Sequence, residues 1–99
     1  MKVTIKAIRF DATAKLEEFI QKKVTKLEQY SDDITLVDVS LKVVKPESAD
    51  NKEVLIKALI PNNELVATKV ADTFEEAFDN ALEALIRQLI KIKEKREAK

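Results

Sequence analysis

The side chains of this sequence that could do chemistry are mainly cations, and they gather near its end. The stretch LIRQLIKIKEKREAK contains Arg87, Lys91, Lys93 and Lys95. At about 100° per residue, Arg87, Lys91 and Lys95 would form one row along a helix. Such a row can bind phosphates, but it can also be a solvated helix end, where cations offset the partial negative charge of the terminal carbonyls. The charge pattern alone leaves both interpretations open.

Three more lysines, in the string QKKVTK, belong to an earlier segment with helical periodicity. The same angular spacing places Lys22 and Lys26 on one flank of the apolar side of that segment. Lys23 falls close to the apolar side itself, where its aliphatic stem could cover apolar surface. A phosphate-binding surface therefore requires two helices that present their cations on a common outer ridge.

Most of the residue types used by enzymes and metal sites are missing. The sequence has no histidine, cysteine or glycine. The commonest general base, thiolate ligands and glycine-rich phosphate loops are thereby excluded. Glu75 and Asp79 lie one turn apart and could in principle act as acid and base, but a solvated helix start explains that pair better. We expect no enzyme, cofactor or bound metal.

The length of the chain predicts one domain, over residues 1–99. The 99 residues carry 18 Lys and Arg against 18 Asp and Glu, so the formal net charge is zero. The first ten residues, MKVTIKAIRF, alternate polar and apolar side chains rather than forming a continuous apolar segment. This pattern predicts neither a signal peptide nor a membrane span.

Two periodicities predict the secondary structure. Alternating apolar residues predict strands from Val3 to near Phe10 and over 35–43, 54–60 and 65–71, with a loop at PESADN (46–51) and a turn at PNN (61–63). Helical spacing predicts one helix from an N-cap at Asp11 or Thr13 to about Tyr30. A second helix of about 20 residues should follow a capping box at Thr73–Glu76.

The element order β-α-β-β-β-α predicts an α+β fold. Three consecutive strands favour an antiparallel meander, and each strand has one apolar face. We therefore expect a two-layer sandwich, in which a four-stranded sheet has both helices packed on one face and its other face largely wet.

Several strings resemble the ribosome hibernation-promoting factor family, which includes ribosome-associated inhibitor A. They are FIQKKVTKLEQYSDDI, VSLKVVK and ADTFEEAFDNALEALIRQLIKIKEK, and the likeness covers essentially the whole chain. Lys22, Lys23 and Lys26 stand where the family has a KK..K pattern, and Arg87, Lys91 and Lys93 stand where its second helix is basic. Ala84 and Ile90 depart from the family, which often has lysine and arginine at these positions.

The resemblance implies a cytoplasmic stress-response protein of the short type. Members of the family bind the small ribosomal subunit, through 16S rRNA and neighbouring ribosomal proteins, near the mRNA and tRNA channel. We therefore expect a translation inhibitor that promotes ribosome hibernation by occupancy, with no membrane or small-molecule partner. The candidate RNA-binding residues are Lys22, Lys23, Lys26, Arg87, Lys91, Lys93 and Lys95. The alternative is a protein-interaction or homo-oligomeric module, suggested by Ile86 and Ile90 beside the main apolar stripe.

Overall fold

The structure, a computed structural model, describes residues 1–44 and 50–97 and has the predicted order of elements. The predicted loop at 46–51 therefore lies mostly outside the described residues. The elements are β1 (Lys2–Ile8), α1 (Ala14–Val24), the 3-10 helix η1 (Thr25–Gln29), β2 (Leu36–Val43), β3 (Lys52–Ile60), β4 (Asn63–Ala71) and α2 (Phe74–Glu97).

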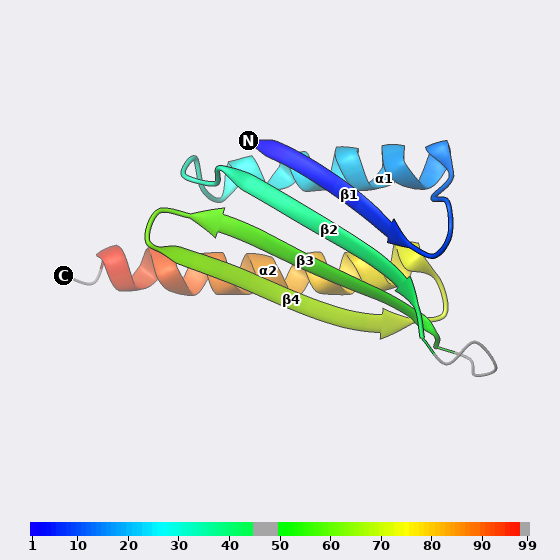
Figure 1. Cartoon of the computed structure of the whole chain (residues 1–99). Helices are drawn as coiled ribbons and strands as arrows, with labels where there is room; N and C mark the ends of the chain where they lie inside the picture. Colours follow the sequence, from blue (N-terminus) through cyan, green and yellow to red (C-terminus); the bar gives the residue numbers. More distant parts are fainter. Residues whose placement is uncertain (45–49, 98–99) are drawn as a thin grey trace.

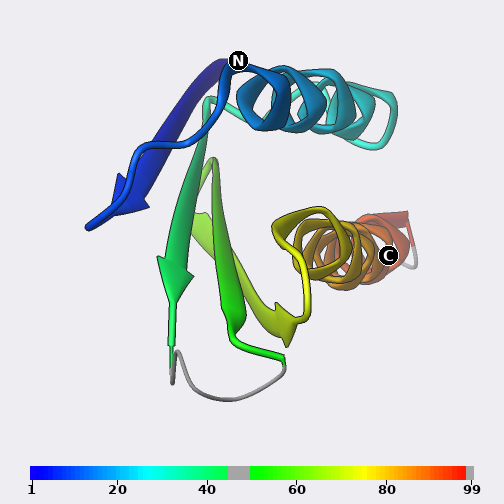
Figure 2. The ribbon, with the colours of Figure 1, turned by 90° about the vertical axis from the view of Figure 1, so that its right-hand side faces the viewer.

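The four strands form one sheet in the order β1-β2-β3-β4. As predicted, β2, β3 and β4 form an antiparallel meander, whereas β1 pairs in parallel with β2. Figures 1 and 2 show both helices on the same face of this sheet, side by side and running in the same direction. The predicted two-layer sandwich is confirmed, and the two helices form its second layer.

The first helix differs from the prediction in its last turn. Thr13 is the N-cap, and its Oγ1 accepts a hydrogen bond from the Leu16 N–H at 3.1 Å. The α-helix ends at Val24 and continues as the 3-10 helix η1 rather than as α-helix to Tyr30. The Thr25 hydroxyl donates to the Lys22 carbonyl at 2.6 Å, where it competes with the α-helical bond of Lys26. Leu27 is still fully buried, because the tighter turn keeps it facing the core.

The second helix and the last hairpin begin where their sequence signals predict. The Thr73 Oγ1 accepts from the Glu76 N–H at 3.1 Å, which is one half of the capping box. The helix α2 has 24 residues, more than the predicted 20, because helix-forming Lys and Glu residues continue it beyond the apolar stripe. In the turn between β3 and β4, Asn62 has φ 65°, the left-handed conformation that asparagine tolerates.

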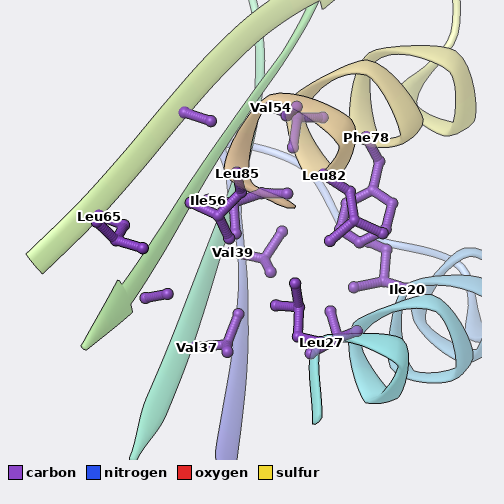
Figure 3. Close-up of a cluster of buried hydrophobic side chains, with 14 of the residues drawn as sticks. Ile20, Leu27, Val37, Val39, Val54, Ile56, Leu65, Phe78, Leu82 and Leu85 are labelled. Carbon is purple, nitrogen blue, oxygen red and sulfur yellow. The ribbon is translucent and has the colours of Figure 1, made fainter. Parts of the chain in front are cut away.

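The core lies between the sheet and the helices. Figure 3 shows Ile20 of α1 beside Phe78 of α2, and Leu85 of α2 beside Ile56 of β3, within one buried cluster. Phe19 and Phe78 join the two helices edge to face, with ring centroids 6.1 Å apart. The opposite face of the sheet is accessible, as predicted, but it is not wholly polar, since Val66 and Val70 are 43% and 44% exposed.

Candidate nucleic-acid interface

Lys23 joins the two helices rather than standing free at the surface. It lies one turn after Phe19 on α1, and its Nζ is 5.3 Å from the centroid of that ring. The same Nζ lies 3.4 Å from Oδ1 of Asp79 on α2. The side chain of Lys23 is 33% exposed, which agrees with the position predicted close to the apolar side. The ion pair of Lys23 with Asp79 therefore helps to hold α1 against α2.

Two further candidate cations pair with carboxylates of their own helix. Lys22 Nζ lies 3.6 Å from Glu18 Oε1, and Arg87 Nη2 donates to Glu83 Oε1 at 2.5 Å. All four side chains are more than 60% exposed. Exposed pairs of this spacing contribute only about 0.3–0.5 kcal/mol, so an incoming phosphate can displace the carboxylate at small cost.

The remaining candidates are exposed and unpaired. Lys26, Lys91, Lys93 and Lys95 are exposed, and none forms an ion pair with any side chain in the part of the chain that the structure describes. Binding of phosphate by these four ammonium groups therefore breaks no ion pair among the described residues. They are the cations most available to an anionic partner.

The structure divides the cations of α2 between its two flanks. Lys93 lines a hollow of about 260 Å³ together with the segment Tyr30–Asp33, which follows η1 on the α1 side. Arg87 instead lines a hollow of about 220 Å³ beside β4. Lys91 and Lys95 continue the row of Arg87 at helical spacing. The candidate surface thus extends across α2, from the α1 side to the β4 edge, rather than along a single ridge.

Lys69 is a cation that the sequence analysis missed. It lies on β4 in the hollow beside Arg87, together with Asn80, Glu83 and Ala84. Its register with Leu65, Ala67 and Ala71, all buried, places it on the helix-facing side of the strand. A charged residue at an inward position of an alternating strand is the signal that could have identified it.

The two isoleucines that suggested a protein interface differ in burial. Ile86 is half-buried and packs against the core. Ile90, by contrast, is 41% exposed. A single exposed isoleucine is common on soluble proteins, so it indicates no apolar patch by itself.

Asp50, just before β3, and Asp72, just before α2, form a carboxylate pair. The Asp50 N–H donates to Asp72 Oδ1 at 2.7 Å. A hydrogen bond between the two side chains, helped by the negative charge of Asp72, raises the pKa of Asp50 above its ordinary value. A raised carboxyl pKa means that the folded state holds the proton more tightly than the unfolded state does. This pair therefore favours folding most in acid, and its contribution is lost as the pH rises through the pKa of Asp50.

Replacing Asp72 by asparagine is expected to return the pKa of Asp50 toward its ordinary value, because the substitution removes the carboxylate that shares a hydrogen bond with protonated Asp50 and, with it, the neighbouring charge. A carbon-detected NMR titration of the aspartate carboxyl groups measures the shift. Asp33→Asn, a change far along the chain from Asp50, is the control and should leave the pKa of Asp50 unchanged. An Asp50 pKa that is identical in the wild type and the Asp72→Asn variant would contradict the assigned cause.

Within the described residues, no helix is both long and apolar enough to cross a membrane. No group of three or more carboxylates in those same residues is arranged to hold a metal ion. The arrangement offers exposed cations on two helices and one strand, which can bind anions but provides no nucleophile–base pair.

Comparison with known proteins identifies relatives over nearly the whole chain. The model of the family described as Sigma 54 modulation protein / S30EA ribosomal protein matches residues 3–97. A protein of Pseudomonas putida named ribosome hibernation promoting factor is 32% identical over 98 residues, which are 99% of this chain and 92% of that protein. The protein of the same name in Escherichia coli K12 is 33% identical over 95 residues, 96% of each chain.

Two solved structures have the same fold. A ribosomal subunit interface protein from Coxiella burnetii superposes with a TM-score of 0.84 at 22% identity, over 94% of this chain and 98% of that one. The N-terminal domain of Protein Y from Thermus thermophilus gives a TM-score of 0.79 at 17% identity, over 93% and 99% of the two chains. The relatives are named for ribosome hibernation, a role that requires binding rather than catalysis.

Proposed function

Because the chain belongs to the family described as Sigma 54 modulation protein / S30EA ribosomal protein, we propose that it is a ribosome hibernation factor. It binds the small ribosomal subunit near the mRNA and tRNA channel, in the cytoplasm, and inhibits translation by occupying that site. The relatives named ribosome hibernation promoting factor support a role in ribosome hibernation. The cations of α1, η1 and α2 support binding through RNA phosphates.

The observation that carries the mode of binding is the set of exposed lysines that form no ion pair with a described residue. They are Lys26 on η1 and Lys91, Lys93 and Lys95 on α2. A rigid layer of this kind can engage the phosphates of folded RNA by shape, without reading base edges. Because the net charge of the whole chain is zero, attraction depends on this local surface rather than on the overall charge.

Binding to purified small ribosomal subunits is expected to weaken steeply with salt. If about five cations each neutralise one phosphate, the logarithm of the association constant falls against the logarithm of the salt concentration with a slope of roughly −3.5 to −4.5. Co-sedimentation at several potassium chloride concentrations measures this slope. A complex whose stability is independent of salt would contradict a phosphate-binding surface. A salt-insensitive dimer that does not bind ribosomes would instead support an interface built around Ile90.

A further inference from the structure

We infer that the hollow between β4 and α2 is a phosphate-binding subsite, in which Lys69 and Arg87 together hold one phosphate of the bound RNA backbone. This inference rests on the proposed function and extends the RNA-binding surface from the helices to the edge of the sheet. This β4–α2 subsite is lined by Lys69, Asn80, Glu83, Ala84 and Arg87.

A hydrogen bond beside this subsite ties its two sides together. The Gln88 Nε2 donates to the carbonyl oxygen of Val66 at 2.9 Å, which ties α2 to the edge strand. Ala84 lies one turn before Gln88 on the same flank of the helix, and its methyl group is too short to fill the space opposite Lys69. A hollow of about 220 Å³ remains, which accommodates a phosphate group with its hydration water.

The charges of the subsite suit an anion with several oxygens. Lys69 is exposed and has no ion-pair partner among the described residues, so its ammonium group is available. Arg87 offers a planar fork of donors that matches two oxygens of a phosphate, and the Asn80 amide can donate a further hydrogen bond. These groups come from two elements, so their combination depends on the fold and not on either element alone.

The chemistry favours RNA over an acidic peptide. Lys91 and Lys95 follow Arg87 at intervals of one turn and extend the positive charge along α2 beyond the subsite. A nucleic-acid backbone carries phosphates at regular intervals and can meet these cations in succession. A single carboxylate would satisfy the subsite but leave the continuing row without partners.

Glu83 competes with the phosphate in this subsite. Its Oε1 accepts from Arg87 Nη2 at 2.5 Å, so the guanidinium group must exchange a carboxylate for the phosphate when RNA binds. The retained carboxylate also repels the incoming phosphate. Glu83 is therefore expected to lower the affinity of the subsite for phosphate.

The test compares Lys69→Gln with Lys42→Gln in binding to purified small ribosomal subunits. Both changes remove one exposed lysine, but Lys42 lies on the outer face of β2, away from the helices. We expect Lys69→Gln to weaken binding about fivefold to tenfold and to reduce the magnitude of the salt slope by about one, while Lys42→Gln changes affinity less than about twofold. Glu83→Gln should tighten binding about twofold to fivefold, and this gain should shrink when Lys69→Gln is added.

The outcomes separate this inference from the proposed function. If the wild type binds small subunits but Lys69→Gln and Lys42→Gln weaken binding equally, the subsite is overturned and the proposed function stands. If the wild type does not bind small subunits, both fail together. Equal melting temperatures of the variants, measured by circular dichroism, show that lost binding does not come from unfolding. Inorganic phosphate should compete with binding of the wild type more than chloride does at the same ionic strength, and this excess should be lost in Lys69→Gln. An equal excess in both proteins would overturn the subsite.

Discussion

A variant that carries Lys26→Glu, Lys91→Glu and Lys95→Glu is expected to bind small ribosomal subunits at least about a hundredfold more weakly than the wild type. Each charge-assisted hydrogen bond to a phosphate contributes about 1.5–3 kcal/mol, so three lost contacts account for this factor even if each contributes at the low end. Reversal also adds repulsion. The three lysines are chosen because they have no ion-pair partner among the described residues, so that their replacement disturbs no internal contact.

The matched control is the triple variant Lys2→Glu, Lys6→Glu and Lys42→Glu. These lysines are also exposed, but their register in β1 and β2 places them on the face of the sheet opposite the helices. The change in net charge is the same, so the control measures the effect of overall charge. Quantitative co-sedimentation at low salt compares the two variants. An equal loss in both would show that binding depends on net charge, and it would contradict a surface formed by α1, η1 and α2.

Phe78→Ala is expected to cost about 3–5 kcal/mol of the free energy of unfolding, the range measured for truncating buried aromatic residues. Phe78 is fully buried and is among the largest such side chains in the core. Its ring meets Phe19 edge to face, so the change removes packing between the helices as well as against the sheet. A domain of this size has a free energy of unfolding of only about 5–15 kcal/mol, so this single change removes a large fraction of its stability.

Urea unfolding followed by circular dichroism measures this cost. Ile90→Ala on the same helix is the control, because Ile90 is 41% exposed and its truncation should cost less than about 0.5 kcal/mol. A loss below about 1 kcal/mol for Phe78→Ala, or an equal loss in both variants, would contradict the packing described here. Because Asp79 follows Phe78 in the chain, the Phe78→Ala change should also weaken the ion pair between Asp79 and Lys23.

Much of the candidate surface could be predicted from local patterns. The exposed positions of Lys22, Lys26 and Lys91 follow from their helical angle to the apolar residues, which is a local property of each segment. The partial burial of Lys23 was predicted in the same way. The ion pair between Lys23 and Asp79 could not be predicted, because it joins two helices whose rotation about their own axes is set by core packing. The position of Lys69 beside Arg87 depends likewise on how closely α2 passes the edge strand.

The sequence by itself determined the order, type and faces of the elements, because periodicity, the Thr13 and Thr73 caps and the Asn62 turn act over a few neighbouring residues. It also contained the strings that resemble the hibernation factors, and the family match over residues 3–97 agrees with that resemblance. The tertiary structure decided that β1 pairs in parallel with β2, that Lys23 pairs with Asp79 of the other helix, and that Lys69 lies beside Arg87. The physical reason is that these outcomes depend on distances between side chains in different elements and on the rotamers that packing leaves open, and no local pattern records either.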